Sequence, residues 1–320
     1  MWTLRYSMLA TLGLMVAMTA CTRPDADPAV DTIPVDTALG TDTIPTAIDL
    51  RGWTEDAGPA LYVAEEDGDR AIVVLPQMSD SMLADTASLA AMPLELGAMT
   101  GASLELFGRS GRAGTATVAT ADEASLADGD ACTAWPSLAL STVSSGGSWT
   151  VALGAGRATA IHLDSIDILA GPDSARMTAE VSRLASMLPH DTVPAFRGLP
   201  FAVRNVRSFS PVAGVSALVA EVVRKVNQEA NPREERILIV AERDSGKTSG
   251  RYAVAYSERA SGTEEDVETT DVLAAVALGP ERVPTLILRR EYFEGSAYSL
   301  LERIGAKSWR VRWTSAYTGC

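Results

Sequence analysis

Pairs of short apolar runs separated by turn residues recur along this chain, and they constrain its fold more than any other feature. The first pair, 61–63 and 71–75, flanks an Asp67-Gly68 step, which strongly favours a hairpin turn. Two more pairs flank glycine-containing turns: 104–107 with 115–118, and 149–153 with 158–163. Three hairpins in succession predict an antiparallel sheet.

The last third of the chain repeats this pattern. We expect residues 237–241 to pair with 252–256, and residues 285–290 to pair with 298–303. The final run, 309–313, alternates tryptophan or valine with arginine, as a strand with one buried face does.

One stretch follows a helical period instead. Four apolar side chains recur at spacings of four, three and four residues: Met177, Val181, Leu184 and Leu188. They predict a helix over 174–188, which Pro172 opens and Pro189 closes. A second apolar run, 215–226, fits a helix or a strand, because valine-rich runs suit strands equally well.

These patterns predict a mainly β fold of antiparallel hairpins with one or two helices. The 320 residues, of which 47% are hydrophobic, are enough for a substantial core. We expect a signal peptide at 1–20, a disordered tether at 21–47, a β-rich domain at 48–170 and an α+β domain with C-terminal hairpins at 171–320. A single propeller-like or sandwich-like body is the alternative to two domains.

The first 20 residues have the features of an export signal. Arg5 supplies positive charge, and the apolar stretch 8–18 is shorter than the roughly 20 residues that span a bilayer. It ends in Met18-Thr19-Ala20-Cys21, which resembles the lipobox of bacterial lipoproteins, with Met18 where leucine is usual. The resemblance implies that Cys21 is diacylated and becomes the mature N-terminus. An ordinary secretory leader is the alternative.

Lipidation at Cys21 implies a stable membrane anchor, because two acyl chains hold a protein to a bilayer where one is marginal. Thr22 follows the cysteine in place of Asp, so the resemblance favours the outer membrane over retention in the inner one. Prolines and aspartates alternate through 22–47 without any aromatic residue, and Asp-Thr-Ile-Pro occurs twice. Such a segment buries too little apolar area to fold and is expected to be a tether.

The remaining cysteines, Cys132 and Cys320, are expected to form a disulfide in an oxidising compartment. Two unrelated reduced thiols are the alternative. The chain contains only two histidines, His162 and His190, and no second cysteine lies at ligand spacing. We therefore predict no metal site and no cofactor.

The formal net charge of −14 repels phosphates and anionic lipid, so nucleic acid is excluded as a partner. Residues 281–320 differ, with seven basic and four acidic side chains. We expect this basic segment to pack beside acidic neighbours and not to form a binding patch.

The run 241–248 imitates a phosphate-binding P-loop after an apolar strand. Ala241 stands where the first glycine belongs, and a strand-like segment follows where a helix is required. We interpret the run as a polar hairpin turn and predict no nucleotide partner.

No catalytic residue is assigned. His162 beside Asp164 and His190 beside Asp191 are candidate bases, yet such histidines commonly have only structural roles. The acidic clusters at 65–69, 128–130 and 264–268 lack the spacing of an EF-hand and are interpreted as solvated turns.

Residues 289–298, within the hairpin 285–303, resemble the hairpin that follows the Asp-Gly-Asp loop in FG-GAP-type propeller repeats. The preceding residues 278–282 lack the aspartate ligands of that loop, so the resemblance implies no calcium site.

Two functions are consistent with these features. The first is a non-catalytic envelope lipoprotein that binds a protein or glycan partner through a β surface. The alternative is a secreted hydrolase that uses Asp or Glu side chains or His162. A deep cleft lined by carboxylates or His162 favours the hydrolase, whereas a flat apolar patch favours binding.

Overall fold

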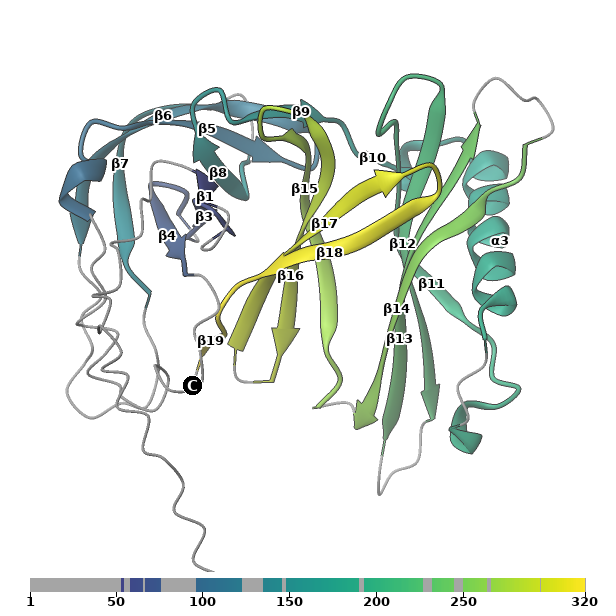
Figure 1. Ribbon diagram of the computed structural model, residues 1–320. Coiled ribbons are helices and arrows are strands. Elements are labelled where there is room, and N and C mark those ends of the chain that lie inside the picture. The colour runs from purple at the N-terminus through teal and green to yellow at the C-terminus, as the bar shows by residue number, and fades with distance from the viewer. Residues whose placement is uncertain are drawn as a thin grey trace, which may run out of the picture. The chain divides into compact units, whose positions relative to one another are not determined.

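The computed structural model describes residues 53–54, 58–65, 67–75, 96–122, 135–145, 148–189, 193–226, 232–244, 250–263, 266–293 and 295–319. All of them belong to one compact unit, residues 45–320. Strands paired antiparallel make up most of this part of the chain, with one α-helix (Figure 1). The predicted class, mainly β with antiparallel hairpins and a helix, is confirmed.

The earlier strands close into a six-stranded barrel in the order β3-β4-β7-β6-β5-β8. Their bounds are β3 Leu61–Ala64, β4 Arg70–Val74, β5 Ser103–Gly108, β6 Gly111–Asp122, β7 Ser137–Ser145 and β8 Val151–Gly154. The β3-β4 and β5-β6 hairpins are the first two predicted from sequence. The short elements nearby are β1 Trp53–Thr54, β2 Gly58–Pro59 and the 3-10 helix η1 Leu96–Met99.

The third predicted hairpin, 149–153 with 158–163, is wrong, although both strands exist. β8 pairs with β3 on one edge and with β5 on the other, so neither edge is left for the strand that follows. That strand, β9 (Ala158–Ile161), pairs instead with β15 (Thr269–Leu278) in a different sheet. The turn at 154–157 therefore redirects the chain from the barrel into a second sheet.

Two further sheets pack face to face as a sandwich. One has the order β10-β11-β12-β13-β14, and the other has the order β18-β17-β16-β15-β9, with β19 on β17. The strands of the first sheet are β10 Asp164–Ser165, β11 Ala202–Phe209, β12 Val215–Val226, β13 Arg233–Asp244 and β14 Ala253–Thr263. The remaining strands of the second are β16 Val283–Tyr292, β17 Gly295–Gly305, β18 Ser308–Thr314 and β19 Thr318–Gly319. The predicted hairpins β13-β14 and β16-β17 are confirmed.

The ambiguous run 215–226 is the strand β12, so the second helix does not form. Its two faces are both covered. Leu218 packs in the same cluster as Leu184 of the helix, whereas Val219 packs against the second sheet with Leu286. Burial on both faces removes the apolar–polar alternation by which a strand is recognised in sequence.

The sheet that contains β16 and β17 is also buried on both faces. Ile287 and Leu300 belong to the core shared with the barrel, whereas Leu286 and Leu301 belong to the core of the sandwich. The barrel, the two sheets and the helix are therefore stacked in that order, each layer contributing to the next core.

The helix predicted at 174–188 is α3, Gly171–Met187. It begins earlier than the apolar period indicates because Pro172 fits the first helical turn, where its missing N–H costs nothing. Val181, Leu184 and Ala185 are buried against β12 and β13. Figure 1 shows α3 lying beside this sheet. The 3-10 helices η2 Ile166–Ile168 and η3 Pro194–Phe196 complete the elements.

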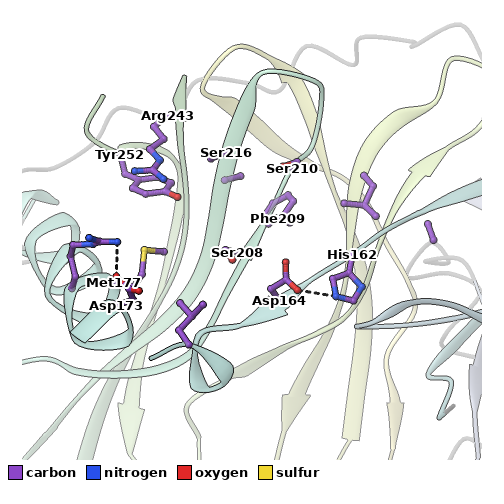
Figure 2. A pocket seen from close by; sticks show the side chains of 15 residues that line it. His162, Asp164, Asp173, Met177, Ser208, Phe209, Ser210, Ser216, Arg243 and Tyr252 are labelled. Carbon is purple, nitrogen blue, oxygen red and sulfur yellow. Dashed lines mark ion pairs between the residues drawn. The ribbon is translucent and has the colours of Figure 1, made fainter. Parts of the chain in front are cut away.

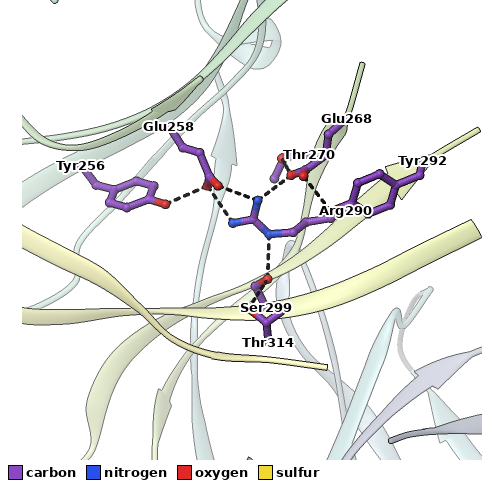
Figure 3. A network of polar contacts seen from close by, with 8 residues as sticks. All are labelled: Tyr256, Glu258, Glu268, Thr270, Arg290, Tyr292, Ser299 and Thr314. Atoms are coloured by element: carbon purple, nitrogen blue, oxygen red, sulfur yellow. Dashed lines mark hydrogen bonds and ion pairs between the residues drawn. The ribbon is translucent and has the colours of Figure 1, made fainter. Parts of the chain in front are cut away.

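The basic C-terminal segment packs beside acidic side chains, as predicted. Arg290, only 5% exposed, donates two hydrogen bonds to Glu258 of β14 and one to Glu268 (Figure 3). It also donates to Ser299 at 2.7 Å. Arg312 pairs with Glu302 at 3.0 Å. The contacts of Arg290 join strands of both sheets, because Glu258 belongs to one sheet and Ser299 to the other.

Several sequence predictions concern residues outside the described part of the chain. They are the signal peptide, the tether, lipidation of Cys21, the disulfide between Cys132 and Cys320, and His190. Within the described residues, no helix has the length and apolar character needed to cross a membrane.

Candidate functional site

A pocket of about 560 Å³ lies where the first turns of α3 face the ends of several strands (Figure 2). Its lining comprises Ala160, Ile161, His162, Asp164, Leu169, Asp173, Arg176, Met177, Ser208, Phe209, Ser210, Ser216, Ala217, Arg243 and Tyr252. They come from β9, β10, α3, β11, β12, β13 and the start of the β14 hairpin arm. The pocket thus exists only in the assembled fold.

Strand register brings the polar lining residues together. Asp164 of β10 pairs with Ser208 of β11, and Ser216 of β12 pairs with Arg243 of β13. All four lie near strand ends, where the sheet gives way to turns and side chains are not enclosed on both faces. This is why polar groups gather here beside a sheet whose middle is apolar on both faces.

His162 and Asp164, neighbours in the sequence, do meet in the pocket. Nε2 of His162 lies 2.9 Å from Oδ1 of Asp164, and Nδ1 lies 2.7 Å from the carbonyl oxygen of Ser110. Both side chains are about half exposed, at 57% and 50%. A histidine acting as a base needs a nitrogen lone pair facing its substrate. Here each nitrogen faces an acceptor, and only a ring with a proton on both nitrogens donates to both.

The second carboxylate of the pocket is paired with an arginine. Asp173 in the first turn of α3 pairs with Arg176, with Oδ1 and Nη2 3.0 Å apart. The spacing of three residues places the two side chains on one helix face. Both pocket carboxylates are therefore held by neighbours on their own segments.

Arg243 lies over the ring of Tyr252, with its guanidinium carbon 4.7 Å from the ring centroid. The ring itself is buried in the core between α3 and the sheet. Burial raises the pKa of the Tyr252 hydroxyl, and Arg243 only partly opposes this shift. The hydroxyl, which points toward the middle of the pocket in Figure 2, therefore remains a hydrogen-bond donor at neutral pH.

The lining combines many hydroxyls with a balanced set of charges. Ser208, Ser210, Ser216 and Tyr252 contribute hydroxyl groups, and Phe209 contributes an aromatic ring. Two arginines and two aspartates give a formal charge of zero when His162 is neutral, against −14 for the whole chain. The pocket is thus much less negative than the protein that contains it.

A second cavity of about 50 Å³ lies among paired charges, including Glu221, Arg236 and Glu258. It is large enough for a water molecule and not for a larger ligand. No three His, Cys, Asp or Glu side chains in the described ranges are placed to hold a metal ion.

The sequence identified only part of this site. His162 and Asp164 were candidates because they lie two residues apart. Arg243 lies in the run 241–248, which we interpreted only as a polar turn, and Tyr252 and Ser208 come from distant segments without a motif. No described residue of the acidic clusters or of the hairpin 285–303 lines the pocket.

Comparison with models of protein families, with curated proteins and with solved structures gives no match for this chain. The chemistry of the pocket is therefore the basis on which a function is assigned.

Proposed function

We propose that this chain is a lipid-anchored protein of the cell envelope that binds a glycan in the pocket beside α3. One observation carries the proposal: a pocket of about 560 Å³ whose lining offers four hydroxyl side chains, paired carboxylates and an aromatic ring. These groups belong to seven segments of the fold, whose packing positions them before any ligand binds.

The size and polarity of the pocket support a small polyhydroxylated ligand. Small-molecule sites usually enclose about 300–1,000 Å³. Serine and tyrosine hydroxyls both donate and accept hydrogen bonds, as sugar hydroxyls do. An apolar lipid tail would leave these lining groups desolvated without partners, at a cost of about 1–3 kcal/mol each.

The expected location in the cell envelope supports the same ligand class. The leader and the sequence Met18-Thr19-Ala20-Cys21 resemble those of bacterial lipoproteins, which would place the folded part in the envelope. Glycans are abundant there, and nucleotides are not. The anchor at Cys21 would keep the pocket close to its ligand without a transmembrane helix.

Calorimetric titration of the full-length protein in detergent with fragments of envelope glycans tests the binding. We expect at least one fragment to bind, and Tyr252→Phe to weaken it about 2- to 10-fold through loss of one hydrogen bond. Ser186→Ala, on an exposed position of α3 outside the pocket, is the control and should bind as the parent does. A folded protein that binds no fragment contradicts the proposal.

The anchor is tested separately with labelled palmitate. We expect the label on the protein in the outer-membrane fraction, and its loss in Cys21→Ala. An unlabelled protein found in the cytosol contradicts the lipid anchor, the envelope location and the expected disulfide together.

The alternative function is a hydrolase, because His162 and Asp164 contact each other inside the pocket at 2.9 Å. The contact of Nε2 with Asp164 opposes a role as base, because Nδ1 already faces the Ser110 carbonyl and neither ring nitrogen then faces a substrate. Product analysis after incubation with a bound glycan distinguishes the two functions. Unchanged glycan supports binding alone, whereas cleavage that stops in Asp164→Asn supports the hydrolase.

A further inference from the structure

Arg243 is an exposed arginine of β13 that lines the pocket, whereas two neighbouring arginines of its sheet are paired with carboxylates. Arg224 pairs with Glu235, and Arg236 pairs with Glu221 at 2.9 Å. No carboxylate lies within ion-pair distance of Arg243 in the part of the chain that the structure describes. Arg243 is therefore an exposed cation at the pocket wall that no carboxylate of the described residues neutralises.

The position of this cation is nevertheless restrained. The ring of Tyr252, 6% exposed and packed in the core, contacts the guanidinium from one side. A guanidinium carries five N–H donors, so its contact with one aromatic side chain leaves other donors for a ligand. Arg243 therefore presents donors at the pocket wall. Its contact with Tyr252 already restricts the side chain, so less conformational entropy is lost when a ligand binds.

The surroundings of Arg243 suit an oxyanion. The hydroxyl of Tyr252 points into the same pocket, and Ser216 lies opposite Arg243 in the strand register (Figure 2). Hydroxyl and guanidinium groups together bind a planar carboxylate or a phosphate through charge-assisted hydrogen bonds. The acidic lining residues Asp164 and Asp173 contact His162 and Arg176, and neither forms an ion pair with Arg243.

We infer that the pocket selects glycans that carry an oxyanion, and that Arg243 is the residue that binds this group. The inference rests on the proposed glycan-binding function and specifies its ligand class. A carboxylate on an acidic sugar and a phosphate substituent share the chemistry that Arg243 recognises, and the experiment separates them.

The experiment compares three forms of one oligosaccharide that binds the full-length protein: neutral, oxidised to a carboxylate, and phosphorylated. We expect one or both charged forms to bind about 10-fold or more tightly than the neutral form, since hydrogen bonds to charged groups are the stronger ones. Added salt should reduce this preference.

Arg243→Gln should abolish the preference, so that the charged forms bind the variant no more tightly than the neutral form does. Arg251→Gln is the matched control, because Arg251 is exposed beside Tyr252 but does not line the pocket. It should keep the full preference. Melting temperatures of both variants, compared with the parent, verify that each is folded.

The outcomes are distinguishable. Equal affinity for all three forms overturns the inference and leaves glycan binding intact. A preference that survives in Arg243→Gln overturns the role of Arg243. Failure of every form to bind the folded protein overturns the proposed function and this inference with it.

Discussion

Arg303 of β17 donates two hydrogen bonds to Glu242 of β13, with Nε–Oε1 2.8 Å and Nη2–Oε2 3.0 Å, and so joins the two sheets of the sandwich. The carboxylate is only 1% exposed. It also accepts hydrogen bonds from the indole of Trp309 at 2.6 Å and from the amide of Lys307 at 2.9 Å. The buried charge is thus surrounded by donors from the opposite sheet.

Removing Arg303 should be costly, because Glu242 would keep its buried charge without a counter-ion. We expect Arg303→Ala to lower the free energy of unfolding by about 3–5 kcal/mol, measured by urea denaturation. Arg310→Ala, on an exposed position of β18, is the matched control and should change it by less than about 0.5 kcal/mol. Equal losses in both variants would show that the cross-sheet pair contributes nothing specific.

Stability should fall in acid, because several carboxylates have lowered pKa values in the folded state. Burial raises the pKa of Glu242 and Glu258, but their hydrogen bonds with Arg303 and Arg290 outweigh it, and the net shift is downward. A carboxyl whose folded pKa is depressed stabilises the fold above its unfolded value of about 4.3. That contribution is lost as the pH falls through the folded pKa.

Melting temperatures recorded from about pH 7 to about pH 3 measure this loss. We expect a decline that begins below about pH 4.5 and is shallower in Glu242→Gln, which has no carboxyl to protonate at that position. If the melting temperature of Glu242→Gln falls with pH as steeply as that of the parent, protonation of Glu242 does not contribute to the loss of stability in acid.

Tyr292 should resist ionisation. Partial desolvation of a side chain that is 40% exposed, together with a 2.8 Å hydrogen bond to Glu268, raises its pKa to about 12 (Figure 3). The ring should therefore stay protonated at about pH 10, where a free tyrosine is half ionised. NMR of tyrosine-labelled protein checks this, with Tyr292→Phe to assign the signal. In Glu268→Gln the pKa should fall, whereas Glu281→Gln, in an exposed turn, should leave it unchanged.

Gly108 at the end of β5 should not tolerate a side chain. A Cβ there would lie 2.8 Å from the backbone carbonyl oxygen of Ser148, which has no side-chain freedom to move away. We expect Gly108→Ala to destabilise the protein by about 1–3 kcal/mol in thermal unfolding. Gly97, with nothing within 4 Å of its Cβ position, is the control, and its change to Ala should be neutral or stabilising. A neutral Gly108→Ala would contradict the tight approach of these two segments.

The sequence predicted the site only where its residues are close along the chain. His162 and Asp164 were recognisable as a pair, and the structure places them 2.9 Å apart. Arg243 and Ser216 are adjacent only through the register of β12 and β13, and α3 reaches the same pocket from a third direction. No periodicity or motif predicts that these residues lie close together, because their proximity depends on how separate elements pack.

By itself, the sequence determined the local elements: four of the five predicted hairpins, the helix α3 and the mainly β class follow from turn residues and apolar periods, which act over a few residues. Only the tertiary structure decided that β9 leaves β8 for β15, and that 215–226 is a strand. Both outcomes depend on which distant edge or face covers a segment, since strand pairing satisfies backbone hydrogen bonds between residues far apart in the chain. The pocket also depends on tertiary structure, because its lining comes from segments that are brought together only when the sheets and α3 pack.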